Sequence, residues 1–443
     1  MTTRSLPARH TIVAALAAGA CAAAMGGAGL GAAPAANATC ASIFGIGNGG
    51  GCTSSFLSAA IAIGDGATAT ANGVFGAAIA LGTNALAETG DAFTFATALG
   101  DAANASATGL FGIATQVGSN GSAATLGSGS FGNLGLNIAL NLGLGSAATN
   151  TVTAAGIGNL AANLFGRASS SGSHAVSALG TLDVALNVGG DDNTVYSGTG
   201  FFNRSLNFFG NGNTVRGEGG LGNVARNFLG NGNTATTDTG NGNSATNFLG
   251  SNNSVTLTSG AGNIATSLLG DTNTVSVTGG TLDGARNWLG SANTVQTGGG
   301  LQNTVVNIGG AGNQLIATGS NSNNALNLFG NTNIVEAGSL GANGNLALTF
   351  GGAGNTVTGG ASSGNNTAGF GIFGSGNTVT AGPGPLALAG SIFQTGQTVT
   401  KVGPGIAINN FRIGGAAALG RSAASKSPST PVRNSAAARS AAK

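Results

Sequence analysis

The feature that most constrains this chain is a phrase of 20 residues that recurs between Leu186 and Thr380. Asn returns at the same place in every copy, with a constant step that lengthens slightly only for the last two copies. This ladder consists of Asn193, Asn213, Asn233, Asn253, Asn273, Asn293, Asn313, Asn333, Asn355 and Asn377. A Gly column and an apolar column, which include Gly210 and Val215, keep the same step. A weaker Asn series lies half a period away, so one copy is two strand–turn units of about ten residues each.

This periodicity predicts an all-β protein, a parallel β-solenoid (β-helix or β-roll) of coils of about 18–23 residues with a disordered C-terminal tail. Equivalent residues would stack at the normal interstrand spacing of about 4.8 Å. Gly suits the cramped backbone of each turn. Asn tolerates a left-handed turn and can bond to its copy in the next coil. The β-branched residues of the apolar column would fill the core.

The composition supports a repeat architecture over a disordered coil. Gly makes up 84 of the 443 residues, whereas charged residues are only 6%. Disorder usually combines high charge with low hydrophobicity, but 41% of this chain is apolar. Residues 39–400 carry twelve acidic and five basic residues, and residues 401–443 carry seven basic residues and no acidic one. Such a basic tail is either simply solvated or a contact for an anionic polymer or membrane surface.

Residues 1–38 resemble a secretory signal peptide. Arg4 and Arg9 precede an Ala-rich apolar run, and Ala36-Asn37-Ala38 is a small-x-small cleavage site. An alternative is lipidation at Cys21, although the sequence before it is a poor match to a lipoprotein signal. Because Gly, Asn or Thr interrupts every later apolar run, we expect no transmembrane segment after signal removal.

Two cysteines follow the predicted cleavage site. Cys40 and Cys52 lie close together in the sequence, and an exported chain meets oxidising conditions, so we expect a disulfide. Closing so short a loop is worth roughly 2–3 kcal/mol. The bond would close the first coil within an N-terminal cap, residues 39–60.

Four further segments follow the cap. Residues 61–126 form an 18-residue repeat, with Gly at positions 64, 82, 100 and 118 and alternating small side chains between them. This repeat resembles the head repeats of trimeric autotransporter adhesins, a resemblance that implies a β-roll. Residues 127–186 are irregular coils with longer intervals, and 187–400 hold the 20–22-residue repeat. Residues 401–443 are a terminal coil remnant and a basic Ala/Ser-rich tail that we expect to be disordered.

Two adjacent columns of the repeat are large and apolar, as in Phe208-Phe209 and Phe228-Leu229. The first of them is the candidate interaction stripe, which comprises Phe208, Phe228, Phe248, Leu268, Trp288, Ile308, Leu328 and Phe350. Neighbours in a regular strand face opposite sides. Either a turn lets both columns point inward, or one column is an exposed stripe. We expect the inward arrangement, because a turn-forming Gly follows at once; an outward stripe would be a docking surface.

The sequence offers little chemistry for catalysis. His174 lies in a Ser/Gly-rich stretch that we expect to be a solvated loop. Asp191-Asp192 reads as a turn variant with at most a weak cation contact. Calcium-binding solenoids use Asp at the recurring polar position, and Asn is a poor substitute for it. We therefore expect no catalytic residue, no metal ligand and no cofactor, and the chain is not expected to be an enzyme.

The Asn-Phe-Leu-Gly-Asn-Gly-Asn-Thr phrases, such as the one that begins at Asn227, resemble the Gly/Asn-rich tandem repeats of mycobacterial exported proteins of the PPE family. The Pro-Glu or Pro-Pro-Glu domain of the PE and PPE families is missing. The resemblance implies a secreted or cell-envelope protein without catalysis. Three functions compete: a structural surface protein, an adhesin or host-interaction protein, and a polysaccharide-active solenoid enzyme, the last of which lacks its acidic groove. Envelope polymer or self-association are candidate partners, and no nucleic acid is expected.

Overall fold

The computed structural model describes residues 39–127, 135–143, 148–339, 341–415 and 417–421. The predicted signal peptide, Cys21 and residues 422–443 of the predicted basic tail lie outside these ranges. The described chain contains no α-helix and forms a parallel β-solenoid, as the period predicts. It divides into two compact units between Leu289 and Gly290, and each unit is described by itself.

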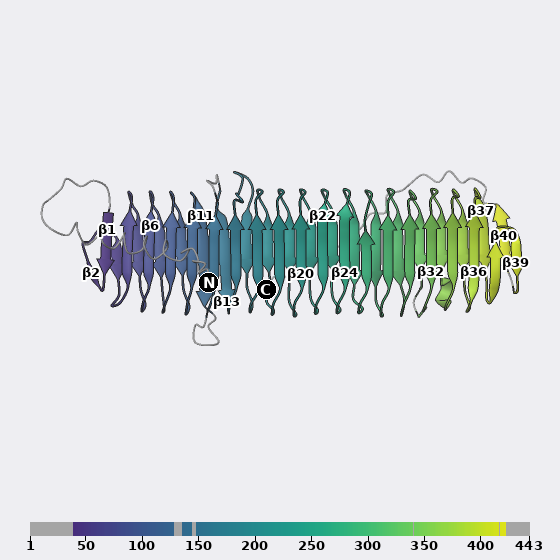
Figure 1. Cartoon of the computed structure of the whole chain (residues 1–443), viewed down its shortest axis with the longest axis horizontal. Coiled ribbons are helices and arrows are strands. Elements are labelled where there is room, and N and C mark those ends of the chain that lie inside the picture. Colours follow the sequence, from purple (N-terminus) through teal and green to yellow (C-terminus); the bar gives the residue numbers. More distant parts are fainter. Residues whose placement is uncertain (1–38, 128–134, 144–147, 340, 416, 422–443) are drawn as a thin grey trace, which may run out of the picture. The chain divides into compact units, whose positions relative to one another are not determined.

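In unit 1 the strands alternate along the chain between two sheets, A and B (Figure 1). Sheet A contains β1 (Thr39–Ile43), β2 (Ile46–Gly47), β4 (Ala59–Ile63), β6 (Ala77–Leu81), β8 (Phe95–Leu99), β10 (Ile113–Val117), β12 (Ile138–Leu142), β14 (Leu160–Leu164), β16 (Val184–Val188), β18 (Arg204–Phe208), β20 (Val224–Phe228), β22 (Ser244–Leu249), β24 (Ile264–Leu269) and β26 (Gly284–Asn287). Sheet B contains β3 (Cys52–Ser54), β5 (Thr68–Ala71), β7 (Leu86–Thr89), β9 (Asn104–Ala107), β11 (Gly121–Gly127), β13 (Asn150–Gly156), β15 (His174–Ala178), β17 (Thr194–Ser197), β19 (Thr214–Gly217), β21 (Thr234–Thr237), β23 (Ser254–Leu257) and β25 (Thr274–Thr278).

The register pairs equivalent residues of successive coils. Phe208 of β18 pairs with Phe228 of β20, and Val215 of β19 pairs with Ala235 of β21, each in parallel and one period apart. Between β4 and β6 the step is the shorter one of the first repeat, and Ile61 pairs with Ile79. Each coil thus contributes one strand to each sheet, and its backbone bonds go to the coils before and after it.

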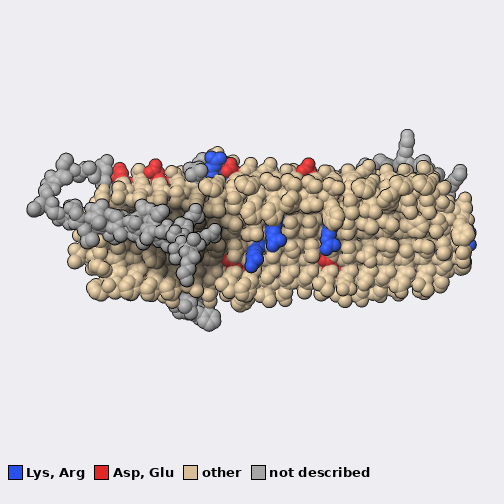
Figure 2. Space-filling view, viewed as in Figure 1, with Lys and Arg blue, Asp and Glu red and all other residues tan. Residues whose placement is uncertain are grey.

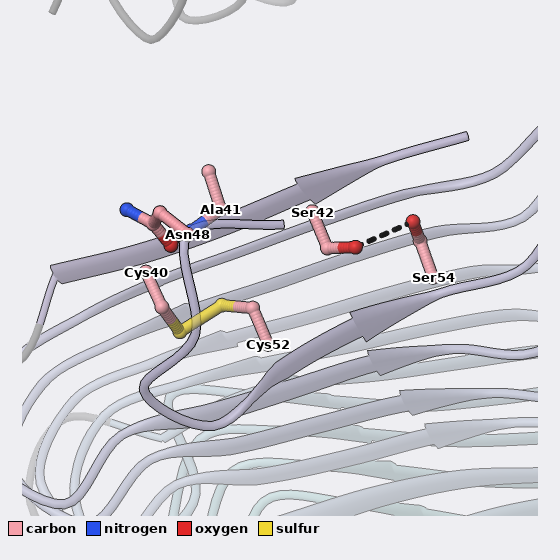
Figure 3. Close-up of a disulfide and its surroundings, with 6 residues drawn as sticks. All are labelled: Cys40, Ala41, Ser42, Asn48, Cys52 and Ser54. Carbon is pink, nitrogen blue, oxygen red and sulfur yellow. Dashed lines mark hydrogen bonds between the residues drawn. A yellow bond between two sulfur atoms is a disulfide. The ribbon is translucent and has the colours of Figure 1, made fainter. Parts of the chain in front are cut away.

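The first coil is closed by an antiparallel strand. β1 pairs antiparallel with β4, and the short strand β2 folds back on β1. The disulfide between Cys40 and Cys52 ties β1 of sheet A to β3 of sheet B (Figure 3). Beside it the hydroxyls of Ser42 and Ser54 lie 2.7 Å apart. This end therefore carries a covalent and a hydrogen-bonded link between the sheets, in the segment predicted to be the cap.

The core between the two sheets consists of one layer of inward-pointing side chains from each sheet. In β18 to β26 the inward positions are occupied by small or amide side chains, and in sheet B by residues such as Val215 and Val255, which are fully buried. The predicted apolar column therefore lies in the core. In the earlier 18-residue coils the inward residues are mostly Ala, for example Ala60 and Ala62. A core built of Ala has no room for Phe.

Unit 2 repeats the same two-sheet plan. Its sheet A contains β28 (Thr304–Ile308), β30 (Asn324–Leu328), β32 (Leu346–Phe350), β34 (Ala368–Ile372), β36 (Ala387–Ile392), β38 (Gly405–Ile408) and β39 (Phe411–Ile413). Its sheet B contains β27 (Thr294–Gly298), β29 (Gln314–Thr318), β31 (Ile334–Ala337), β33 (Thr356–Gly359), β35 (Thr378–Ala381), β37 (Gln397–Lys401) and β40 (Ala417–Arg421). One short 3-10 helix, Ala361–Ser363, lies in the turn after β33.

The last coil of unit 2 is also closed by antiparallel strands. β39 pairs antiparallel with β38, and β40 pairs antiparallel with β37. The terminal remnant expected after residue 400 therefore forms strands as far as Arg421. Lys401 is buried at this end, and its ammonium donates to the carbonyls of Val402 and Gly403 at 2.9 and 3.1 Å. Both closures replace the missing neighbouring coil with chain that runs in the opposite direction.

Candidate functional site

The predicted Asn ladder is buried and bonds coil to coil. Each of its ten members is at most 1% exposed. In unit 1 the side-chain oxygen of Asn233 accepts the backbone N–H of Asn253 at 2.9 Å, and Asn213 does the same for Asn233. The side-chain nitrogen of Asn233 donates to the carbonyl of Gly250 at 2.8 Å. The amide therefore satisfies one donor and one acceptor of the next turn, which the strand ladder leaves unpaired.

In unit 2 the ladder has the same geometry. The side-chain oxygen of Asn313 accepts the N–H of Asn333 at 3.0 Å, and Asn355 accepts that of Asn377 at 3.1 Å. The ladder residues are not the left-handed ones, contrary to our explanation of why Asn recurs. The left-handed position is the residue before, as at Gly232 and Asn252. Asn is required here for its amide group.

The weaker half-period series is a second ladder of the same kind. The side-chain oxygen of Asn203 accepts the N–H of Asn223 at 2.9 Å, and Asn223 does so for Asn243 at 3.0 Å. This series also runs back through the irregular coils, where Asn137 bonds to Asn159 at 3.0 Å. The bridge of residues 127–186 therefore keeps the hydrogen-bonding scheme while its loops vary in length.

A third amide ladder, in the middle of sheet A, escaped the sequence analysis. The side-chain nitrogen of Asn227 donates to the side-chain oxygen of Asn207 at 2.8 Å, and Asn247 donates to Asn227 at 2.7 Å. These three side chains are fully buried. A signal for this ladder is present in the sequence, because Asn stands before Phe at positions 207, 227 and 247 with the period of the repeat. These bonds join side chain to side chain, whereas the other two ladders bond side chain to backbone and add side-chain bonds in some coils, as between Asn273 and Asn253 at 3.1 Å.

His174 is not in a solvated loop, as we expected, but is the first residue of β15 and fully buried. Its Nε2 lies 2.9 Å from the side-chain oxygen of Asn163, and its Nδ1 accepts the backbone N–H of Asn193 at 3.2 Å. It therefore occupies an Asn position of the first ladder. Burial lowers the pKa of His174 to about 4, against the opposing effect of Asp191 and Asp192. The ring is neutral at pH 7.

Asp183 replaces Asn in the second ladder. One carboxylate oxygen accepts the N–H of Asn203 at 2.8 Å, and the other, Oδ2, is buried without a hydrogen-bond partner. Burial raises the pKa of Asp183 to about 6, and the hydrogen bond from Asn203 opposes this rise. An aspartate at this position resembles the asparagine it replaces only when it is protonated.

The acidic pair Asp191-Asp192 lies in a turn, as predicted. Asp191 pairs with Arg167 at 3.4 Å, and Asp192 has the left-handed φ of 55° and accepts the N–H of Ser169 at 2.8 Å. The described residues contain no group of three or more His, Cys, Asp or Glu side chains that could hold a metal ion. The pair is accounted for by local turn geometry.

The two large apolar columns both face outward, so the inward arrangement that we expected is wrong. Asn207 points into the core, so strand alternation points Phe208 outward. The chain then enters the turn at Phe209, which has the left-handed φ of 57° and remains 53% exposed. A bulky residue in this conformation is uncommon, and here it keeps the second column outside as well.

The stripe differs in exposure along the chain. In unit 1 Phe248 and Trp288 are 40% and 44% exposed, and Phe208, Phe228 and Leu268 are half-buried. The Phe208 and Phe228 rings stack with centroids 5.1 Å apart and an interplanar angle of 2°. In unit 2 Ile308, Leu328 and Phe350 are half-buried on the outer side of sheet A. The side chains cover one another along the column, which is why several are only partly exposed.

Charged side chains occupy little of the face drawn in Figure 2. The described residues form two ion pairs, Arg167 with Asp191 and Arg216 with Glu218. None of the helical structure in the described chain is long and apolar enough to cross a membrane. Comparison with family models, with curated proteins and with solved structures gives no match to this chain.

Proposed function

We propose that this chain is a non-enzymatic structural protein of the cell envelope or cell surface that acts as a rigid repeat scaffold. The observation that carries the proposal is the set of buried amide ladders. Asn233, for example, bonds to the backbone of the following coil through both side-chain atoms. Such bonds use the polar chemistry of the repeat to hold coils together. They leave the exterior free to vary, as in a scaffold.

Export is supported by the N-terminal sequence and by the cysteines. Residues 1–38 have the n-region, the apolar run and the cleavage site of a signal peptide. The disulfide between Cys40 and Cys52 would be stable in an oxidising compartment and rare in a cytosol. These two features depend on different parts of the chain, and they favour the same location.

Cell fractionation tests the proposal. We expect the protein in the wall, membrane or medium fraction, with a mature N-terminus at Thr39 and with both remaining cysteines resistant to a thiol reagent until reductant is added. A matched variant with Ala36 and Ala38 replaced by Phe should keep the uncleaved signal. A cytosolic location with two reactive thiols would contradict the proposal.

The outward stripe favours a second candidate, an adhesin or host-interaction protein. Its partner would contact the exposed rings of Phe248 and Trp288. Phe228→Ser together with Phe248→Ser should abolish surface binding while the unfolding midpoint changes little. Binding that survives this double substitution would remove the stripe from the proposal.

A further inference from the structure

The outer side of sheet A over β18, β20, β22, β24 and β26, here called the A face, combines apolar and cationic side chains. Its last column is the unit 1 part of the stripe, which ends at Trp288 directly after β26. Its other columns include Leu206, Val224 and Ile264, whose side chains point outward. The Phe/Leu/Trp column is continuous along these strands, whereas the other two columns also hold Ser244, Thr246 and Thr266. A monomeric soluble protein rarely exposes a continuous apolar column of this kind without a partner.

The charges on the A face are all positive. Arg204, Arg226 and Arg286 point outward from these strands, and the described side chains of the same strands include no Asp or Glu. None of the three forms an ion pair with any residue that the structure describes. Asp283 stands just before β26, but its side chain is buried at 1% exposure in the second ladder.

The outer side of sheet B provides the contrast within the same coils. Its one arginine between β17 and β25, Arg216, pairs with Glu218 and lies 5.6 Å from the ring centre of Tyr196. The rest of that surface is largely Thr and Ser, as in Thr234-Ala235-Thr236. In these coils the outer side of sheet B is polar and its arginine is paired, whereas the outer side of sheet A carries a continuous apolar column and unpaired cations.

These features decide between two occupants. A second copy of the chain packed on the A face would bury the guanidinium groups without a carboxylate to receive them, which is costly. An anionic phospholipid layer offers phosphate groups that accept bidentate bonds from arginine, beside acyl chains that accept apolar side chains. Trp also favours the level of the lipid headgroups.

We propose that the A face of unit 1 is a docking surface for the anionic phospholipid layer of a membrane. This proposal shares one element with the proposed function, because both use the stripe as the contact surface. The chain would lie on the membrane with the Phe/Trp column among the headgroups and with Arg204, Arg226 and Arg286 on phosphates.

Trp288 is the only tryptophan in the chain and lies on the A face, so it reports docking directly. We would titrate the full exported chain with vesicles of phosphatidylglycerol and phosphatidylcholine, and with vesicles of phosphatidylcholine alone. With the anionic vesicles only, we expect the emission of Trp288 to shift to the blue and to be quenched by brominated acyl chains. Both signals should become weaker as the salt concentration is raised, because salt screens the attraction between arginine and phosphate.

Matched arginine variants locate the surface. Arg226→Gln and Arg286→Gln should each weaken vesicle binding about fivefold, the share of one basic residue near an anionic membrane. Arg216→Gln makes the same charge change on the opposite sheet and should leave binding within about twofold. Circular dichroism and the urea midpoint of each variant would show that the fold is kept.

Three results would overturn the proposal: no binding to anionic vesicles at low salt, bound protein whose Trp288 is not quenched, or equal losses for Arg216→Gln and Arg226→Gln. If Trp288 is instead shielded in vesicle-free buffer while sedimentation shows a dimer, the occupant is a second copy. In that case the lipid proposal fails and the scaffold function stands. Only a cytosolic location removes the scaffold function.

Discussion

The 18-residue coils of β4 to β10 and the 20-residue coils of β18 to β26 build the same two-sheet fold with different interiors. Ala62 occupies the inward place in β4 that Asn207 occupies in β18, and Ala67 before β5 corresponds to Asn213 before β19. The turn before β5 spans residues 64–67, and the turn before β19 spans 209–213. The longer coil therefore has an extra turn residue and an amide side chain beside it.

The difference shows what the asparagines are for. In the short turn the backbone bonds to itself, with Ala67 N–H donating to the carbonyl of Gly64 at 3.3 Å. In the long turn the carbonyl of Gly250 receives the side-chain nitrogen of Asn233 instead. A buried backbone group without a partner costs about 1–3 kcal/mol. The longer turn and the buried Asn therefore occur together, because the Asn side chain bonds the carbonyl group that the longer turn leaves without a backbone partner.

The largest expected effect comes from the turn glycine of a 20-residue coil. Gly230 has φ of +128°, and a Cβ there would lie 1.9 Å from the carbonyl oxygen of Gly250. Gly230→Ala should lower the free energy of unfolding by at least about 3 kcal/mol. The alanine would have an unfavourable positive φ, and its Cβ would clash with the next coil at the observed spacing. Urea unfolding measures the change.

Gly222→Ala is the matched control for this substitution. Gly222 has φ of +68°, but a Cβ there would meet nothing within 4 Å. We expect a loss of about 1 kcal/mol from the left-handed conformation alone. Equal losses at the two sites would show that coil stacking does not require Gly230.

The next effect in size is a pH dependence at the histidine of the ladder. Folding lowers the pKa of His174 from 6.5 to about 4, so the fold favours the neutral ring. Its contribution to stability is complete above pH 6.5 and is lost as the pH falls from 6.5 to 4, to a total of about 3 kcal/mol. His174→Asn should restore the ladder residue and flatten that part of the stability curve. Equal acid sensitivity of the two proteins would contradict this assignment.

A smaller loss is expected from one ladder asparagine. Asn233→Ala removes the bond to Asn253 N–H and the bond to the Gly250 carbonyl, and it should cost about 2 kcal/mol. Asn231→Ala is the control, because Asn231 lies in the exposed turn and accepts one N–H, that of Asn211 at 2.8 Å. Its cost should stay below about 1 kcal/mol, and a larger cost at Asn231 would break the comparison.

The last expected change is a gain at Asp183. Because burial raises its pKa to about 6, its contribution to stability is present at low pH and is lost as the pH rises from 3.8 through 6. Asp183→Asn supplies a neutral amide at the same place. The variant should melt at a slightly higher temperature than the parent at pH 8 and show no gain at pH 4. A loss at pH 8 would show that the carboxylate is required.

The period of the sequence predicted the fold class and the main ladder because stacked coils place equivalent residues in the same environment. The residues of an Asn or Val column can therefore be assigned a shared structural role without knowing the cross-section of the coil. The direction of the Phe column could not be read in this way. The second column faces outward as well because Phe209 and Leu229 have a left-handed backbone, a conformation in which large side chains are seldom found.

His174 was misplaced for a related reason. Composition alone assigned the Ser/Gly-rich stretch before it to a loop, and the loop does end there, but His174 already belongs to β15. The intervals of the irregular coils vary, so no period located its column. The A face was also missed, because its arginines lie in two different columns and the pattern shows only when the outward side of sheet A is viewed as a surface.

The most direct test of the account compares two neighbouring residues, Asn227 and Phe228. The account puts the polar side chain in the core and the aromatic one outside. Asn227→Leu should therefore lower the free energy of unfolding by at least about 2 kcal/mol, since it leaves Asn207 and Asn247 without their partner. Phe228→Ser should cost less than about 1 kcal/mol. If urea unfolding of the two variants gives the reverse order, with Asn227→Leu tolerated and Phe228→Ser unfolded, the ladder is not the core of this protein.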